Sequence, residues 1–474
     1  MNIKISDLWH PDGKIDRGAY LLWGAVLFII KYNLDRFIAG YYFNRSWSLF
    51  SYLMLPSEAR VNNLSGNDKF FYGTLLAMAI PFICVGVFLT LRRLRAVQLP
   101  TWLVTFFFVP FINLLFFLIL ATLPSREERA KDKYEPNSIK RTLDRIIPEH
   151  PVGSAAIGLL ITLPLFIGTT AFAVSLLGNY GWSVFVGLPF TLGLISVLVH
   201  GYHRPKGIVS CLLVSFIGIT LLGIGLISIA VEGALCILMA APIGLVLGLI
   251  GGVVGYLIQI RPWLHSESYK VAIMLLLTMP LLIGAESKSP AEAPLIAVTT
   301  SIEIDAPASL VWNNVVTFSE LPAPDSWFFK IGIAYPIKAE ITGQGVGAVR
   351  YCNFSTGPFV EPIEIWDEPK LLKFSVTSQP PAMKELTPYS DIHPPHLTNY
   401  LVSKGGQFLL VELPDKRTRL EGTTWYYHKI WPYTYWQIWS DAIIHRIHLR
   451  VLNHIKNLSE NNSKPNSKPN SVKQ

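Results

Sequence analysis

Histidines are concentrated near the end of the chain, and two of them have a spacing that could support chemistry. His445 and His448 stand three residues apart, so they share one face of a helix. Such a pair could begin a metal site or supply a general acid or base, and Asp441 could hold the ring of His445 by a hydrogen bond. No cysteine or further carboxylate stands at a confirming distance, so a polar edge of an amphipathic helix is the simpler interpretation. We predict no metal ion and no cofactor.

Two other patterns resemble reactive or phosphate-binding motifs. Gly343, Gly345 and Gly347 alternate as in a phosphate loop, but they join one predicted strand to the next, with no helix N-terminus to receive a phosphate. A hairpin turn is therefore favoured. Cys352 falls in the middle of a predicted strand, and the chain contains no Gly-x-Ser-x-Gly, so a nucleophile is unsupported.

The histidine pair lies on a predicted helix over residues 435–457. Its apolar residues recur at steps of three and four, which favours a helix that lies across a sheet: Trp436, Trp439, Ile443, Ile447, Val451 and Ile455. Before it, alternation at residues 300–304 predicts a strand, and Asp305 with Pro307 fits the start of a helix over 308–318. Strand-like runs follow at residues 337–341, 348–355, 361–366, 371–377, 407–413 and 418–428.

Several of these segments resemble the START-like superfamily, also called SRPBCC and including the polyketide cyclase type. The resemblance is carried by four features: Ser301 to Pro307 with Val311 and Trp312 after it, Gly345 to Arg350, Leu420 to Trp425, and the long final helix. It covers residues 298–458. It implies an α+β helix-grip fold, in which a curved antiparallel sheet and a long C-terminal helix enclose a cavity for an apolar or aromatic ligand.

Amphipathic aromatic side chains are abundant in this region and suit the lining of such a cavity. The predicted ligand-binding residues are Trp312, Trp327, Phe354, Phe408, Trp425, Tyr427, Trp436, Ile443 and Ile447. An enzyme of cyclase or aromatase type would in addition need ionisable groups that converge there. The candidates for that role are Asp441, His445 and Tyr427.

The first part of the chain has the composition of a membrane protein. The chain is 51% hydrophobic and 15% charged, which is too apolar for an ordinary soluble enzyme. Apolar stretches predict about eight spans, at residues 19–37, 71–90, 102–123, 152–177, 182–199, 208–229, 234–258 and 271–283. Lysine and arginine cluster in the loops beside them, which indicates a membrane topology signal rather than a nucleic-acid partner.

Two features inside these spans have structural explanations. Lys31 and Asp35 are four residues apart, so they can pair on one helical face close to the headgroups. Glycines in the seventh span have spacings that let helices approach closely, namely Gly244, Gly248, Gly251, Gly252 and Gly255.

Two short motifs resemble the bacterial membrane family DUF805. They are Gly13 to Arg17 just before the first span, and Leu91 to Arg95 followed by Trp102 at the start of the third. The predicted organisation is a DUF805-like membrane region (1–125), a charged cytoplasmic loop (126–150), further transmembrane helices (151–285), a linker (286–297), the START-like domain (298–458) and a disordered tail (459–474).

Positive charge predicts the orientation. The loops 124–150, 204–206 and 261–270 are basic and should face the cytoplasm. The N-terminus and Arg92 to Arg95 can lie on that side only if residues 102–123 form a re-entrant hairpin broken at Pro110. The last run, 271–283, is short for a span; if it crosses, the C-terminal domain lies outside the cytoplasmic (inner) membrane of a bacterium.

Three functions fit these features. The first is binding of a hydrophobic small molecule or lipid, as carrier or sensor, by a domain tethered at the bilayer. The second is a cyclase-like or aromatase-like enzyme that uses the same cavity. The third is a protein-interaction module of the cell envelope, although the sequence identifies no protein partner.

Overall fold

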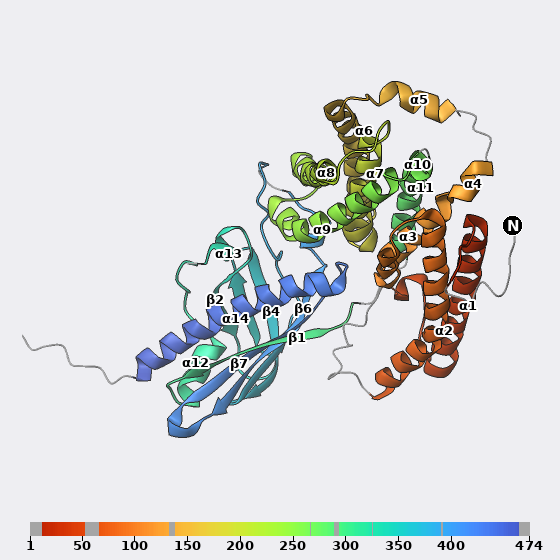
Figure 1. Cartoon of the computed structure of the whole chain (residues 1–474). Coiled ribbons are helices and arrows are strands. Elements are labelled where there is room, and N and C mark those ends of the chain that lie inside the picture. The colour runs from red at the N-terminus through yellow and green to blue at the C-terminus, as the bar shows by residue number, and fades with distance from the viewer. Residues whose placement is uncertain are drawn as a thin grey trace, which may run out of the picture. The chain divides into compact units, whose positions relative to one another are not determined.

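The computed structural model describes residues 12–52, 66–131, 138–265, 267–288, 293–324, 326–389 and 392–463. The chain divides into two compact units (Figure 1). The helical unit contains Met1–Glu232 and Ile237–Ala291, and the sheet unit contains Gly233–Cys236 and Glu292–Gln474.

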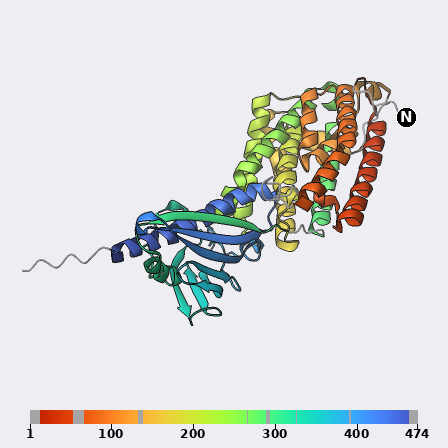
Figure 2. The same ribbon diagram turned by 90° about the horizontal axis from the view of Figure 1, so that it is seen from below.

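The helical unit consists of long apolar helices that run side by side (Figure 2). They are α1 (Arg17–Phe43), α2 (Gly66–Val97), α3 (Ile112–Thr122), α6 (Pro151–Ala171), α7 (Leu188–His200), α8 (Ile208–Ser228), α9 (Ala234–Gln259) and α11 (Ser268–Ser287). Short elements lie between them: η2 (Leu49–Tyr52), η4 (Thr101–Phe108), α4 (Arg126–Lys131), α5 (Ser138–Ile146), η5 (Phe172–Leu176), η6 (Ser183–Gly187) and α10 (Pro262–His265).

Among the described residues, six helices are long and apolar enough to cross a membrane. They are Lys69–Val97, Pro151–Leu176, Ser183–His200, Ile208–Ser228, Ala234–Gln259 and Ser268–Ser287, so six of the eight predicted spans are present as such helices. The last is 20 residues long, so the helix extends beyond the short apolar run at 271–283 to the length of a span. The predicted first span is the helix α1, which carries the expected pair of Lys31 and Asp35 (Lys31 Nζ to Asp35 Oδ2).

The predicted third span, residues 102–123, is not one continuous helix. The 3₁₀-helix η4 ends at Phe108 and α3 begins at Ile112, with Pro110 between them and Phe111 at a φ of 65°. Arg93, near the end of α2, donates hydrogen bonds to the carbonyl oxygens of Leu120 (3.1 Å) and Leu123. The segment therefore leaves and returns at the same end of the unit, which is the re-entrant hairpin that the sequence offered as an alternative.

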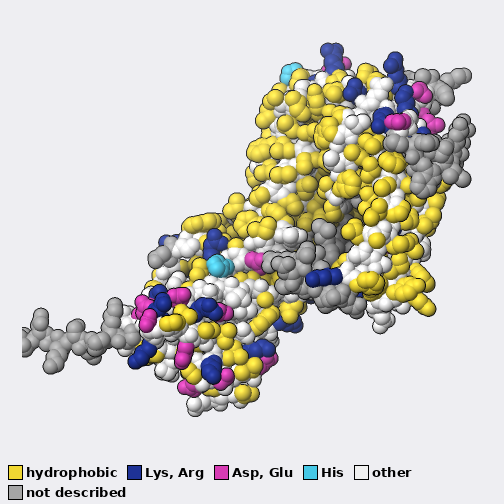
Figure 3. Space-filling model, turned by 60° about the horizontal axis from the view of Figure 1, so that its bottom comes forward, with side chains coloured by type: hydrophobic (Ala, Val, Ile, Leu, Met, Phe, Trp, Pro, Cys, Tyr) yellow, Lys and Arg dark blue, Asp and Glu magenta, His cyan; other side chains and the backbone are white. Residues whose placement is uncertain are grey.

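The basic loops meet at one end of the helical unit. Arg93 Nη1 donates to the carbonyl oxygen of Ile15 just before α1 (2.9 Å), and Trp263 Nε1 donates to that of Val97 at the end of α2 (3.3 Å). His265 Nε2 lies 2.7 Å from the carbonyl oxygen of Gly201, which follows α7. Lysines and arginines gather at this end, while hydrophobic side chains cover the flanks of the helices (Figure 3).

Glycines let α7 and α9 pack backbone to backbone. A Cβ atom on Gly193 would lie 1.9 Å from the carbonyl oxygen of Gly248, and one on Gly251 would lie 2.0 Å from that of Phe190. No side chain fits at such distances, so the helices can touch only because these positions are glycine. This confirms the helix-packing interpretation of the glycines in α9.

The sheet unit contains the predicted curved antiparallel sheet and long terminal helix (Figure 1). Its strands are β1 (Ile296–Ile304), β2 (Pro336–Thr342), β3 (Val349–Phe354), β4 (Gly357–Asp367), β5 (Leu371–Ser375), β6 (Leu401–Glu412) and β7 (Thr418–His428). Their order is β1-β7-β6-β5-β4-β3-β2, and every neighbouring pair is antiparallel. The helices are α12 (Ala308–Val316), α13 (Trp327–Lys330) and α14 (Tyr433–Ser463), with the 3₁₀ turns η7 (Pro395–Leu397) and η8 (Pro414–Lys416).

The core of the sheet unit lies between the inner face of the sheet and the helices α12 and α14. Val451, Leu452 and Ile455 of α14 pack in one cluster with Trp312 of α12 and Leu420 of β7. The apolar stripe read from the sequence is therefore the face of α14 that covers the sheet. The helix extends to Ser463, into the stretch predicted to be a tail, and residues 464–474 lie outside the described residues.

The glycine-rich stretch after β2 is a hairpin turn, as expected. Gly343, Gly345 and Gly347 have φ values of 90°, 80° and 89°, a region that residues with a Cβ rarely adopt. The turn sets the register of β2 against β3, so that Ala339 lies opposite Cys352.

Candidate functional site

The sheet unit contains a cavity of about 120 Å³ between the inner face of its sheet and α14. Its wall is formed by side chains of β3 to β7 and of α14. The lining residues are Arg350, Cys352, Phe354, Phe359, Glu361, Phe374, Val376, Ser403, Gly405, Gln407, Phe408, Gly422, Thr423, Thr424, Ile444, Ile447, His448, Val451 and Leu452. Most of the wall is thus aromatic or aliphatic, with a few polar groups, which is the usual composition of a small-molecule site.

The cavity wall contains a buried ion pair. Arg350 on β3 and Glu361 on β4 are paired directly across the two strands, so their side chains share the inner face of the sheet. Nη1 of Arg350 donates to Oε2 of Glu361, and Nε donates to the carbonyl oxygen of Val316 at 3.3 Å. Burial raises the pKa of the Glu361 carboxyl, while the guanidinium of Arg350 opposes this rise.

Aromatic rings surround the guanidinium of Arg350. Its central carbon lies 5.5 Å from the ring centroids of Phe318, Phe374 and Phe408. These distances allow cation–π attraction, which helps to hold a charge out of water. Phe354 and Phe359 form a second aromatic pair in the wall, with ring centroids 4.7 Å apart.

His448 lies on the α14 side of the cavity and is held by two threonines. Its Nδ1 is 3.1 Å from Oγ1 of Thr300 on β1, and its Nε2 is 2.7 Å from Oγ1 of Thr424 on β7. Burial lowers the pKa of His448 to about 4, so the ring is neutral at pH 7. Thr300 also meets Nδ1 of His445 at 2.8 Å.

Cys352 is the cysteine of the cavity wall. It lies between Arg350 and Phe354 on the inner face of β3 and is buried. Burial, together with the nearby charge of Glu361, raises the pKa of its thiol to about 12. A thiol in this state is a poor nucleophile at neutral pH.

Three of the predicted ligand-binding residues line the cavity: Phe354, Phe408 and Ile447. Others lie elsewhere in the sheet unit. Trp312 is only 1% exposed and packs edge-on against Trp366, and Trp327 on α13 is 66% exposed. Trp436 and Ile443 are buried on α14, outside the set of residues that lines the cavity.

Trp425 and Tyr427 lie on the outer face of the sheet. They alternate along β7 with Thr424, which faces the cavity, and with Tyr426, whose hydroxyl donates to Oδ1 of Asp441 on α14 at 2.6 Å. Lys404 Nζ lies 5.5 Å from the ring centroid of Tyr427 on that outer face. The three candidate catalytic residues, Asp441, His445 and Tyr427, are therefore not brought together in the cavity wall.

The sequence reading missed Arg350, Glu361, Thr424 and His448 as cavity residues. A signal for the first two was present, because a hairpin over residues 349–362 with its turn at 355–356 places them opposite each other. From the sequence, His448 is a candidate for a metal site or for a general acid or base, and not for the wall of the cavity. Its place in the wall depends on how α14 rotates against β1 and β7, which the sequence does not specify.

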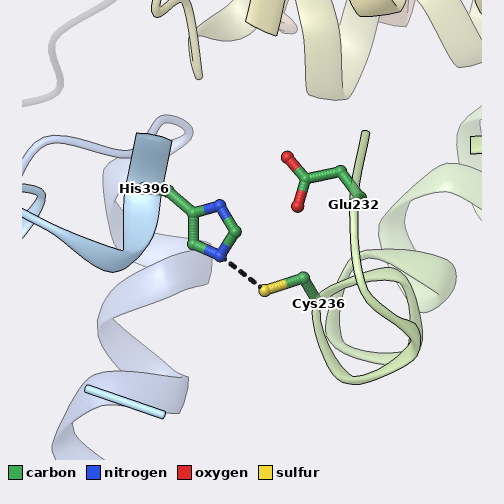
Figure 4. Close-up of side chains that lie close together, drawn as sticks. All are labelled: Glu232, Cys236 and His396. Carbon is green, nitrogen blue, oxygen red and sulfur yellow. Dashed lines mark hydrogen bonds between the residues drawn. The ribbon is translucent and has the colours of Figure 1, made fainter. Parts of the chain in front are cut away.

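A second polar contact in the sheet unit involves Cys236 and His396. The Sγ of Cys236 and the Nε2 of His396 are 2.7 Å apart, and both side chains are buried (Figure 4). Glu385 accepts a hydrogen bond from the backbone N–H of Leu235 at 3.2 Å, and its carboxylate lies 3.8 Å from the same His396 nitrogen. The proline-rich stretch 379–398 supplies both Glu385 and His396.

Comparison with protein families gives a match in the first part of the chain. Residues 8–136 match the model of a family described as "Protein of unknown function (DUF805)". This confirms the resemblance seen in the motifs at residues 13–17 and 91–95. No curated protein matches the chain.

Solved structures match the C-terminal part at low identity. Truncated norcoclaurine synthase from Thalictrum flavum is 14% identical, with 35% of this chain and 95% of that chain covered and a TM-score of 0.24. The Zhui aromatase/cyclase from Streptomyces sp. R1128 is 15% identical (37% and 99% covered, TM-score 0.24), and XoxI from Bacillus cereus is 16% identical (36% and 99% covered, TM-score 0.24). By its own strand order and terminal helix, the sheet unit has the START-like architecture that the sequence predicts.

Proposed function

We propose that this protein is anchored in a membrane by its helical unit and binds a small hydrophobic molecule in the cavity of its START-like domain, as a carrier or a sensor. The cavity is the observation that carries the proposal. Its wall is mainly aromatic and aliphatic, and its few polar groups are already held in place by neighbours, so a bound molecule would find a largely preformed site.

The size of the cavity favours a small ligand over a whole bilayer lipid. A cavity of about 150 Å³ in another protein holds benzene, and the volume here is about 120 Å³. One aromatic ring fits such a space, whereas a lipid with long acyl chains needs a much larger one. Lipid binding would require the sheet and α14 to separate.

We further propose that the START-like domain lies outside the cytoplasm of a bacterial cell. The helical unit has its basic loops and the start of α1 at one end, and this end faces the cytoplasm under the positive-inside rule. Beginning there, α1 and the six apolar helices cross in turn, so α11 ends at Ser287 on the opposite side. The domain follows directly.

The test is native mass spectrometry of the full-length protein released gently from membranes, with identification of any compound that dissociates. We expect an added mass from a small apolar compound, and we expect a Gly422→Leu variant to lose it. Gly422 lines the cavity, and a Cβ there would meet Leu452 at 3.6 Å and Phe408 at 3.7 Å, so the leucine side chain must occupy cavity space. A compound retained by the variant, or the absence of any bound compound together with failure to bind small aromatic probes, would contradict the proposal.

A further inference from the structure

We propose that the cavity selects a neutral aromatic compound with one hydroxyl group, of phenol type, whose oxygen accepts a hydrogen bond from Arg350 and whose O–H donates to Glu361. This inference rests on the proposed function and adds the chemical class of the ligand. It comes from the ion pair in the wall of the cavity and the aromatic rings beside it.

The ion pair retains hydrogen-bonding capacity that the protein does not use. A guanidinium carries five N–H groups, and in Arg350 one is directed to Val316 and one to Glu361. Among the described residues, no hydrogen-bond acceptor meets Nη2 of Arg350, and no donor meets Oε1 of Glu361. Both residues line the cavity, so a donor and an acceptor lie next to each other at its wall.

A hydroxyl group matches this pair because it accepts and donates at one atom. A ketone or an ether can only accept, and it would leave the Glu361 oxygen without a partner. A hydrocarbon would leave both groups without a partner, and buried polar groups without partners are costly. The local chemistry therefore favours a hydroxyl group over these alternatives.

Charge balance favours a neutral ligand. Arg350 is 2% exposed and Glu361 is 6% exposed, so their opposite charges compensate each other away from water. A carboxylate ligand would place an uncompensated negative charge beside this buried pair, and an ammonium ligand would place a positive one there. Either carries a large desolvation cost.

The rings beside the pair favour an aromatic body for the ligand. Phe374 and Phe408 lie next to the guanidinium, and Phe354 and Phe359 continue the wall. Flat rings in offset or edge-on contact gain attraction beyond the burial of their area. A monocyclic ring also fits the volume of about 120 Å³.

The experiment compares three fluorinated probes by ¹⁹F NMR titration of the full-length protein in lipid nanodiscs. The probes are 4-fluorophenol, fluorobenzene and 4-fluorobenzoate, which share one ring and differ in the polar group. We expect 4-fluorophenol to bind about three- to tenfold more tightly than fluorobenzene, the effect of about one net hydrogen bond, and more tightly than 4-fluorobenzoate. Empty nanodiscs and the Gly422→Leu variant measure partition into lipid.

The decisive variant is Glu361→Gln, which keeps the size of the side chain and removes its charge. The charge of Arg350 is then uncompensated, so we expect the order of affinity to reverse in favour of 4-fluorobenzoate. Glu364→Gln on the same strand is the matched control, because Glu364 is exposed and pairs with Lys373 on the surface. We expect this variant to bind the three probes in the same order of affinity as the wild type. The thermal midpoint of each variant reports whether it is folded.

The outcomes separate this inference from the proposed function. The hydroxyl inference would be overturned by a wild-type protein that prefers 4-fluorobenzoate or fluorobenzene, or by a Glu361→Gln variant with the wild-type order of affinity. Binding of any of these aromatic probes would still support the proposal that the cavity binds a small hydrophobic molecule. If none of the probes binds but a co-purified compound is displaced by Gly422→Leu, the inference fails and the proposed function stands. If nothing binds at all, both fail.

Discussion

Arg350 and Glu361 lie directly opposite each other on β3 and β4 and form an ion pair whose side chains are 2% and 8% exposed. Few ion pairs are this completely closed to water, because the cost of desolvation usually exceeds the attraction between the charges. The pair therefore adds little to stability by comparison with an apolar pair of the same size. Each charge nevertheless depends on the other, since either one alone would be buried without compensation.

This dependence predicts an asymmetry between single and double substitutions. Arg350→Met should destabilise the sheet unit by about 3–5 kcal/mol, whereas Arg350→Met combined with Glu361→Leu should cost less, because the double variant leaves no lone charge. Thermal unfolding of the full-length protein in detergent, followed by circular dichroism, measures both. A double variant less stable than Arg350→Met would contradict this account.

The loss of stability caused by Arg350→Met should also depend on pH. Without the guanidinium, burial alone acts on Glu361 and raises the pKa of its carboxyl further, so the group takes up a proton at a higher pH than an ordinary carboxyl does. The neutral acid is less costly to bury than the carboxylate. The difference in unfolding temperature between this variant and the wild type should therefore be smaller at pH 5.5 than at pH 8. A difference that grows at pH 5.5 would show that loss of packing, and not charge, dominates.

Two histidines with lowered pKa values predict that the sheet unit loses stability in mild acid. Burial lowers the pKa of His448 and of His428 to about 4, below the ordinary value near 6.5. The folded protein therefore favours the neutral rings, and their contribution is complete above pH 6.5 and is lost as the pH falls toward 4. Each histidine should lower the free energy of unfolding by roughly 2–3 kcal/mol over that pH range.

The corresponding variants isolate this contribution. In His428→Phe, the ring still stacks on Tyr433, whose centroid lies 4.1 Å from that of His428, but it cannot take up a proton. We expect its unfolding temperature to fall less between pH 7 and pH 4.5 than that of the wild type. His150→Gln, at an exposed position of the helical unit, is the control and should follow the wild type. Equal slopes in all three proteins would refute the assignment.

The fold could be predicted from the sequence wherever a periodic pattern met a clear boundary. The stripe from Trp436 to Ile455 and the turn at Gly343 to Gly347 predict α14 and the β2–β3 hairpin, because helix period and positive φ are local properties. Residues 102–123 show the limit of this approach. Hydropathy there is continuous, and only Pro110 and the distribution of basic residues indicate that the segment turns back.

The site was less predictable because it depends on side-chain direction across several strands. Trp425 and Tyr427 have the composition of pocket residues, yet they alternate with Thr424 and Tyr426 and fall on the outer face of β7. A shift of one residue in register moves every side chain of a strand to the other face. Arg350 and Glu361 do not have the composition of cavity residues because charged residues are rarely buried, and only the strand pairing brings them together.

The thiol of Cys352 should resist alkylation in the folded protein. Its pKa is raised to about 12 and it lies in the wall of the cavity, so very little thiolate is present at pH 8 and access is restricted. We expect less than about one tenth of Cys352 to react with iodoacetamide under conditions that label a cysteine introduced by Tyr351→Cys on the outer face of β3. The modified peptides can be quantified by mass spectrometry after denaturation. Labelling of Cys352 at a similar rate would contradict the burial of this thiol.

The orientation of the helical unit gives a prediction about the side of the membrane on which the START-like domain lies. If the basic end faces the cytoplasm, α11 leads the chain out, and alkaline phosphatase fused after Gln474 should be active while a green fluorescent protein at the same site stays dark. Fusions after Glu149, in the basic loop before α6, should behave in the opposite way. A fluorescent fusion at both positions would show an even number of crossings between them, so the five apolar helices after Glu149 would not all cross. The cavity would in that case sample the cytoplasm, and its ligand should be sought among cytoplasmic compounds.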